Sequence, residues 1–271
     1  MSARLRVQKT LKMYVGGQFI RSESGHTIPA RSSRGEVMHI CKASRKDLRD
    51  AVEIARAAQP GWAGRTAYNR GQILYRLAEI LEDRATALPC PPEDVAHAVD
   101  RAVHHAGWAD KVTAVLSSLN PVGGAYVNYS MIRPVGLVVA CPRGEDGLLG
   151  LVEATCAALL MGNAVILLVP ADASEIAVAF AEALATSDVP GGVVNVLTGD
   201  VAAVLDWADK HDDIDALYVA GDALDAARWT RSQAAAARVM RRLVHVAPAA
   251  EPADPSVLQR LGEVKTVWMS S

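Results

Sequence analysis

The chain has 271 residues, of which 51% are hydrophobic and 21% charged, and its formal net charge is −2. This composition is typical of a folded globular protein and excludes a largely disordered chain. The near balance of 28 basic and 30 acidic residues lacks the basic excess of nucleic-acid-binding proteins. We interpret the densest basic cluster, Arg238, Arg241 and Arg242, as a solvated helix end that offsets the helix dipole. We therefore expect no nucleic-acid partner.

The sequence also gives no sign of a membrane segment or a metal site. Its basic start (MSARLRVQKTLKMYVGG) contains no apolar signal core, and no run approaches the roughly 18 apolar residues of a membrane span. The four cysteines have neither CxxC spacing nor a nearby histidine pattern suited to zinc: Cys41, Cys90, Cys141 and Cys156. We expect no membrane association, no metal, and a reducing, cytoplasmic location.

The first third of the chain predicts short strands followed by helices. Extended stretches at 13–15 and 37–40, separated by glycines and a proline, predict a small hairpin-like arm. Ser44 with Asp47 three residues later is a helix start signal, and apolar residues at helical spacing follow. Two further helical patterns, separated by prolines, cover residues 67–88 and about 93–116.

From residue 135 the pattern changes to alternating strands and helices. Five apolar, β-branched runs occupy residues 135–140, 164–169, 193–197, 216–220 and 243–247. Helical patterns of about 147–161, 173–186, 200–210 and 223–240 separate them. Continuous apolar strands separated by helices form parallel sheets covered on both faces. We therefore predict an α/β fold, a Rossmann-like parallel sheet of about five strands with a helical N-terminal prefix.

Two segments lie outside this pattern. Residues 123–134 alternate in polarity and predict a strand outside the main sheet, which we name the β-arm. The tail begins rich in Pro and Ala and ends in VKTVW at 264–268, which predicts a short strand docked on this chain or on a partner. The expected segments are therefore an N-terminal arm with helices (1–122), the β-arm (123–134), the Rossmann-like part (135–248) and a linker with tail (249–271).

Several sequence segments resemble segments of the aldehyde dehydrogenase superfamily. They are MYVGGQF at 13–19, DAVEIARAAQPGW at 50–62, RGQILYRLAEILED at 70–83, HAGWADK at 105–111, RPVGLV at 133–138, GNAVILLVP at 162–170 and VPGGVVNVLTG at 189–199. They occur in family order over residues 12–247. The resemblance covers only the N-terminal cofactor-binding portion of that family, so it implies one truncated unit related to NAD(P)-dependent oxidoreductases that act on aldehydes.

The family chemistry requires residues that this sequence does not supply. Oxidation through a thioester needs a nucleophilic thiolate, oxyanion donors and a general base. The family nucleophile lies beyond the last Rossmann strand, whereas no cysteine follows Cys156 here. The resemblance places Gly144 at the oxyanion asparagine, and His245 or Val246 at the general-base glutamate. We interpret Cys141 and Cys156 as buried structural thiols and His245 as a strand histidine, and we predict no catalytic residues.

The resemblance also implies where a dinucleotide would bind. The family's cofactor-binding positions correspond to Pro142, Pro170, Asp172, Gly199 and Gly221. The lysine that precedes Pro170 in the family is replaced here by Val169. Asp172 either accepts a ribose hydroxyl or caps the next helix.

Two charged residues bear on the pyrophosphate position. Asp222 stands at a helix start that faces the pyrophosphate in the family, and two like charges about 4 Å apart cost about 4 kcal/mol at an effective dielectric of 20. Arg143 either pairs with Asp222 inside that site or binds an anion itself. We expect the binding of NAD or NADP to be weak or lost.

The leading hypothesis is therefore a catalytically inactive subunit that scaffolds or regulates a full-length aldehyde dehydrogenase. Its partner would be that relative, or a second copy, bound through the β-arm, because an unpaired strand and an uncovered apolar face are liabilities in a free monomer. Two alternatives are an NAD(P)-dependent aldehyde oxidoreductase component completed in trans and a plain dinucleotide-binding module.

Overall fold

A seven-stranded sheet with the order β12-β11-β8-β9-β10-β2-β3 forms the centre of the computed structural model, which describes residues 7–249 and 254–270. Five of its strands are parallel: β8 (Leu137–Cys141), β9 (Ala164–Pro170), β10 (Val194–Gly199), β11 (Ala216–Ala220) and β12 (Arg242–Val246). The predicted α/β fold with a five-stranded parallel sheet is therefore confirmed.

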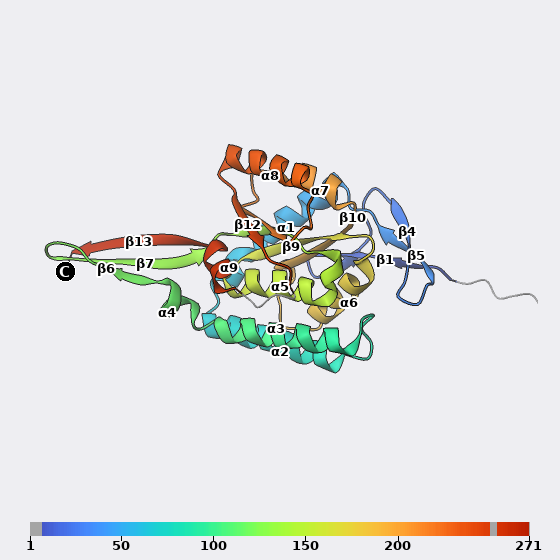
Figure 1. The fold of residues 1–271 in the computed structure, drawn as a ribbon, viewed down its shortest axis with the longest axis horizontal. Coiled ribbons are helices and arrows are strands. Elements are labelled where there is room, and N and C mark those ends of the chain that lie inside the picture. Colours follow the sequence, from blue (N-terminus) through green and yellow to red (C-terminus); the bar gives the residue numbers. More distant parts are fainter. Residues whose placement is uncertain (1–6, 250–253, 271) are drawn as a thin grey trace, which may run out of the picture.

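Helices cover both faces of this sheet (Figure 1), which explains why its central strands β8 and β9 are apolar throughout. One face packs against α1 (Arg45–Ala63) and α7 (Val201–Ala208), with α8 (Ala226–Val239) beyond β12. The other packs against α5 (Gly147–Leu160) and α6 (Ser174–Ala185), with α2 (Ala67–Asp83) and α3 (Pro92–Trp108) as an outer layer. All residues of β8 and β11 are buried.

Local signals set most helix boundaries. Ser44 and Asp47 form the expected capping box at the start of α1. The helix predicted over about 93–116 is interrupted by a turn at 109–111, so α3 ends at Trp108 and a short α4 (Val112–Leu116) follows. The helix predicted from 223 begins at Ala226, because Asp225 is its N-cap and accepts a hydrogen bond from the Arg228 amide at 2.7 Å.

The N-terminal strands belong to two different sheets. β2 (Met13–Val15) and β3 (Gln18–Ile20) form a hairpin through Gly16 and Gly17, whose φ values are +65° and +82°, and β2 joins β10 of the main sheet. A separate sheet has the order β1-β5-β4, with β1 (Lys9–Leu11), β4 (Thr27–Arg31) and β5 (Val37–Cys41). The prediction of one hairpin-like arm was wrong, because residues 13–15 and 37–40 do not pair with each other.

The β-arm is the middle strand of a second three-stranded sheet, which we name the arm sheet and which projects from the body (Figure 1). β7 (Tyr126–Pro134) pairs with β6 (Ser118–Asn120) on one side and with β13 (Gly262–Ser270) on the other. After α9 (Pro255–Arg260), the tail therefore docks on this chain as a nine-residue strand. The expectation that the β-arm is unpaired was wrong; the free edges belong to β6 and β13 instead.

The arginine cluster at the end of α8 is only partly a solvated helix end. Arg238 is exposed in the last turn of α8, as expected. Met240 adopts a left-handed conformation with a φ of +55°, and Arg241 turns inward, where it is only 7% exposed. The Arg241 guanidinium donates to the carbonyl oxygens of Ile214 (2.9 Å) and His211 (2.6 Å). Arg241 thus anchors the connection into β12, which corrects our interpretation for this residue.

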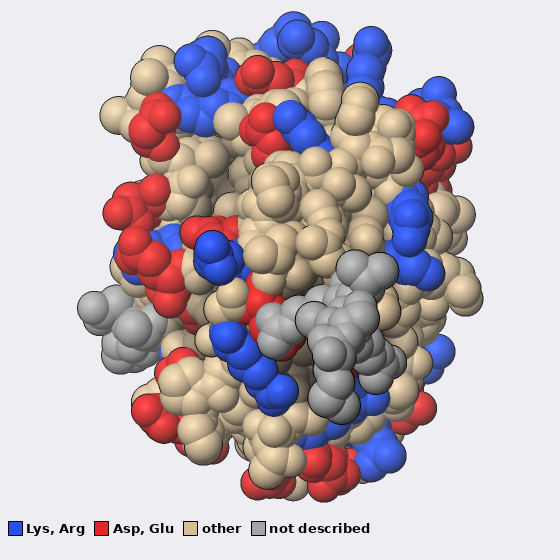
Figure 2. All heavy atoms as spheres, turned by 90° about the vertical axis from the view of Figure 1, so that its right-hand side faces the viewer, with Lys and Arg blue, Asp and Glu red and all other residues tan. Residues whose placement is uncertain are grey.

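The surface shows mixed charge. Figure 2 shows basic and acidic side chains interspersed across the face at the β1-β5-β4 end of the molecule. In the part of the chain that the structure describes, no helix combines the length and the apolar character that a bilayer crossing requires.

Candidate functional site

The strand order of the parallel sheet reverses between β8 and β11. The chain proceeds from β8 through β9 to β10 on one side, and then crosses over to β11 and β12 on the other. In open α/β sheets, ligands bind outside the carboxyl ends of the strands where this reversal occurs. We name this place the switch-point crevice, and it is the first candidate for a binding site.

The structure brings the five predicted cofactor residues to this carboxyl edge. Pro142 and Gly221 directly follow β8 and β11, while Pro170 and Gly199 are register partners at the ends of β9 and β10. A Cβ atom on Gly144 would lie 3.4 Å from Asp172 Oδ1, so the loops after β8 and β9 are in contact. The five residues therefore lie at the same edge of the sheet, as the sequence predicts.

Arg143 spans the crevice. Its Nε lies 2.7 Å from Asp222 Oδ1 in the loop after β11, and its two terminal nitrogens lie 2.6 Å from Glu145 and 3.2 Å from Asp146. A Cβ atom on Gly221 would come within 2.8 Å of Arg143 Cδ, so the arginine stem lies directly over this glycine. Of the two roles considered for Arg143, pairing with Asp222 is the one that the structure contains.

The two helices that begin at the crevice carry their own carboxylates. Asp225 caps α8, and the residues from 221 to 224 form a turn rather than the first turn of the helix. α5 is preceded by a short 3-10 helix (Gly144–Asp146) that carries Glu145 and Asp146, and Asp146 accepts a hydrogen bond from the Ala249 amide at 3.2 Å. Helix N-termini attract anions, but here acidic side chains already lie at both.

Asp172 is exposed and does not cap a helix. Its Oδ1 accepts a hydrogen bond from the adjacent Ala173 amide at 2.9 Å, and Ala173 is the N-cap of α6 without any side-chain cap. The capping role considered for Asp172 is therefore wrong. At the next strand, Asp200 caps α7 and pairs with Lys42 at 3.4 Å, so this carboxylate is already engaged.

Neither the Cys141 thiol nor the Cys156 thiol has the properties of a nucleophile. Cys141 lies at the end of β8 and Cys156 within α5, and both are buried. Burial raises the pKa of Cys141 to about 12 and raises that of Cys156 as well. A thiolate is the reactive form of cysteine, so both side chains are inert at neutral pH.

His245 contributes a contact that the sequence did not reveal. It lies on β12 with an exposed side chain, and its Nε2 is 2.7 Å from the carbonyl oxygen of Gly221. Its ring also packs at 5.4 Å from that of Trp229. His245 thus holds the loop after β11 in place, and only the strand register, which pairs it with Val219, could have indicated this.

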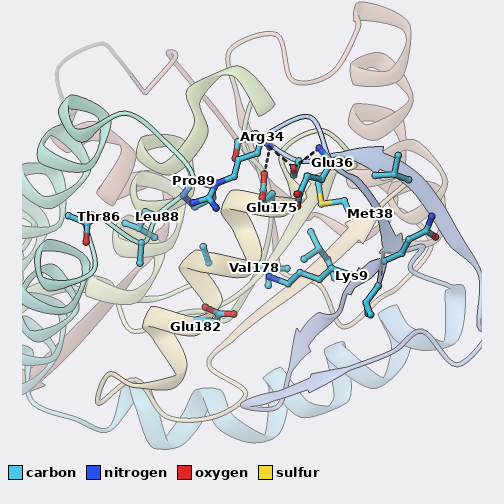
Figure 3. A pocket seen from close by; sticks show the side chains of 18 residues that line it. Lys9, Arg34, Glu36, Met38, Thr86, Leu88, Pro89, Glu175, Val178 and Glu182 are labelled. Atoms are coloured by element: carbon cyan, nitrogen blue, oxygen red, sulfur yellow. Dashed lines mark hydrogen bonds between the residues drawn. The ribbon is translucent and has the colours of Figure 1, made fainter. Parts of the chain in front are cut away.

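A separate cavity of about 530 Å³ lies beyond the outer side of α6, between that helix and the β1-β5-β4 sheet (Figure 3). Lys9, Arg34, Glu36, Glu175 and Glu182 are among its lining residues, and the Ser33 amide donates to Glu175 at 2.6 Å. None of the five predicted cofactor residues lines it. Its mixed charge favours neither an anion nor a cation as a ligand.

Over residues 7–249 and 254–270, no cluster of three His, Cys, Asp or Glu side chains could hold a metal.

Comparison with known proteins identifies one family. Residues 19–244 match the model described as the aldehyde dehydrogenase family. The protein DhaS of Bacillus subtilis (strain 168), whose given name refers to an aldehyde dehydrogenase, is 28% identical over 233 residues, which are 79% of this chain and 46% of DhaS.

Solved structures share the fold. The NAD+ complex of an aldehyde dehydrogenase from Bacillus cereus matches with a TM-score of 0.78 at 23% identity, covering 88% of this chain and 51% of that one. An NAD-dependent aldehyde dehydrogenase from Sinorhizobium meliloti matches with a TM-score of 0.80 at 22% identity, covering 89% and 50%. The chain thus spans about half the length of the relatives that it matches.

Proposed function

Because the chain belongs to the aldehyde dehydrogenase family, we propose that it is a catalytically inactive member that scaffolds or regulates a full-length aldehyde dehydrogenase. The observation that carries this proposal is the ion pair between Arg143 and Asp222 across the switch-point crevice, at 2.7 Å. This pair lies where a bound dinucleotide would have to place its phosphates.

The charges at the crevice oppose a dinucleotide. NAD and NADP are the cofactors of the family, and their pyrophosphate needs unpaired donors. Arg143 instead faces three carboxylates, those of Glu145, Asp146 and Asp222. These three carboxylates share one guanidinium, so the cluster is net negative. At an effective dielectric of 20, an excess charge about 4 Å from a phosphate costs about 4 kcal/mol, and solvent lowers this cost at the exposed Glu145 and Asp222 side chains. The residues present therefore do not fit the cofactor, and we expect NAD or NADP to bind weakly or not at all.

The residues of this chain do not support thioester chemistry either. Gly144, at the position that the resemblance assigns to the oxyanion donor, has no side chain that could donate. The buried Cys141 and Cys156 thiols stay protonated at neutral pH.

The free state of all four cysteines fits a reducing compartment such as the cytoplasm.

The arm sheet supplies the surface for a partner. Its exposed large apolar residues are Leu119, Tyr126, Val127, Val264, Trp268 and Met269. The outer edge of β13 pairs with no strand among the described residues. A partner strand can add to such an edge while the exposed aromatic side chains are buried against it. The scaffolding role of this proposal rests on that surface.

The proposal is tested by co-expressing the tagged chain with a full-length aldehyde dehydrogenase and measuring the mass of the purified complex by light scattering. We expect a mixed oligomer with the wild-type chain, and its loss when Tyr126→Asp and Trp268→Asp are combined. Tyr75→Asp is the matched control, because Tyr75 is 51% exposed on α2, away from the arm sheet. Aldehyde-dependent NADH formation by the purified chain alone would contradict the proposal and favour a complete enzyme.

A further inference from the structure

A second cavity, of about 240 Å³, lies at the root of the arm sheet. It is bounded by the start of α2, by α4 and by the end of β7, and three arginines line it: Arg65, Arg70 and Arg133. No aspartate or glutamate is among its lining residues. This concave surface therefore has a net positive charge, although the whole chain is slightly acidic.

None of these three arginines forms an ion pair with a carboxylate in the described part of the chain. Arg70 is held in place by its own hydrogen bonds, from Nε to the Leu160 carbonyl (3.1 Å) and from Nη1 to the Arg65 carbonyl (2.6 Å). Burial lowers the pKa of Arg70, and no carboxylate opposes that effect. Glu263 stands opposite Arg133 on β13, but its carboxylate pairs with Arg242 at 3.9 Å.

Two buried arginines elsewhere in the described residues have counter-charges. Arg101 lies 2.6 Å from Glu153, and Arg228 lies 2.7 Å from Asp209. Arg70 is partly buried without a carboxylate partner, which is unfavourable for a cation. Arg65 and Arg133 are exposed, and Arg65 Nη1 donates to Asn69 Oδ1 at 2.8 Å, so the cavity offers an anion an excess of positive charge.

The helix that borders the cavity adds to its positive potential. α2 has 17 residues, Thr66 is its N-cap, and its first turn contains no acidic residue. Ala67, the first residue of α2, lines the cavity. The positive end of the helix dipole therefore lies beside the arginines and is not neutralised by the helix's own side chains.

We propose that this cavity binds a phosphate-type oxyanion, either free phosphate or the phosphoryl group of a small ligand. Arginine forks match the geometry of phosphate oxygens and form charge-assisted hydrogen bonds with them. The volume of about 240 Å³ lies below the usual range of pockets for larger ligands, which favours a small anion over a whole dinucleotide. The bound anion bridges α2 and β7, so it fixes the root of the arm sheet against the helical layer.

The test is a thermal-unfolding titration of the full chain with sodium phosphate and with glycerol 3-phosphate, at constant ionic strength maintained with chloride. We expect phosphate to raise Tm in a saturable way, because a ligand that binds only the folded chain stabilises it. Combining Arg65→Gln with Arg133→Gln should weaken the apparent affinity at least tenfold. Arg231→Gln, an exposed arginine on α8, should leave the affinity unchanged.

The outcomes separate clearly. Tighter binding of glycerol 3-phosphate identifies the phosphoryl group of a larger ligand, and tighter binding of phosphate identifies the free anion. Equal affinity in the double variant and the wild type, or no Tm rise with either anion, overturns the proposal. Line broadening of the phosphate signal in phosphorus NMR, lost in the double variant, gives a second readout that does not depend on unfolding.

Discussion

A buried carboxylate between α3 and α5 gives a quantitative prediction for stability. Glu153 Oε2 lies 2.6 Å from Arg101 Nη1 and 2.9 Å from His105 Nε2, and its side chain is only 10% exposed. Burial by itself raises the pKa of Glu153. The hydrogen bonds and charges of His105 and Arg101 outweigh burial and hold this pKa at about 2.

The magnitude and its pH window follow from this pKa. The difference from the ordinary value of 4.5 corresponds to about 3 kcal/mol of folding free energy. A carboxyl whose pKa is lower in the folded chain stabilises that chain while it is ionised. The contribution is therefore complete above about pH 5 and is lost as the pH falls from there towards 2.

The perturbation is Glu153→Gln. It removes the negative charge that Arg101 Nη1 and His105 Nε2 face at 2.6 Å and 2.9 Å, so we expect a loss of about 3 kcal/mol at pH 7. The free energy of unfolding is measured by urea denaturation, followed by tryptophan fluorescence, from pH 7 to pH 3. The fall in stability below pH 5 should be much smaller in the variant than in the wild type.

The control is Glu82→Gln, because Glu82 is exposed near the end of α2. It should change the free energy of unfolding by less than about 0.5 kcal/mol. A loss below about 1 kcal/mol in Glu153→Gln, or pH profiles that run parallel in variant and wild type, would refute the electrostatic reasoning.

Two further predictions concern the tail and the thiols. A Cβ atom on Gly262 would lie 2.6 Å from Ile132 Cγ1, so Gly262→Ala should destabilise the docking of β13 by about 1–3 kcal/mol. Faster hydrogen exchange in 262–270 would show this, with Gly123→Ala, which meets nothing within 4 Å, as the control; unchanged exchange would contradict it. Cys90 is the most exposed of the four cysteines, so it should be the one thiol labelled by a disulfide reagent in the folded chain. Cys90→Ser should abolish rapid labelling, and a remaining fast-reacting thiol would show that a cysteine described as buried is accessible.

Local sequence patterns were sufficient to predict the parallel sheet but not the sheets around it. Continuous apolar runs marked β8 to β12, because strands buried on both faces need apolar side chains at every position. The pairing of β13 with β7 joins segments more than 120 residues apart, and nothing within either segment specifies its partner. The hairpin of β2 and β3 is local, with Gly16 and Gly17 at its turn, but its place beside β10 depends on long-range packing.

The sequence was sufficient to predict where the candidate site lies, but not which of its charged side chains pair with each other. Prolines and glycines at the ends of the predicted strands indicated the edge of the sheet where the site lies. The charged residues Arg143 and Asp222 were also evident in the sequence. Whether they pair depends on which strands are neighbours, and it is the order of β8 beside β11 that brings them to 2.7 Å. Asp172 was ambiguous because its role depends on the backbone geometry of one turn.

A calorimetric titration of NAD+ into the purified chain measures whether the switch-point crevice accepts a dinucleotide. With Arg143 paired to Asp222, we expect no binding heat below millimolar concentrations of NAD+. We also expect at least a tenfold gain in affinity when Asp222→Ser removes the opposing charge. Micromolar binding of NAD+ to the wild-type chain would show that the paired crevice still accepts the cofactor, and that the proposed loss of the dinucleotide site is wrong.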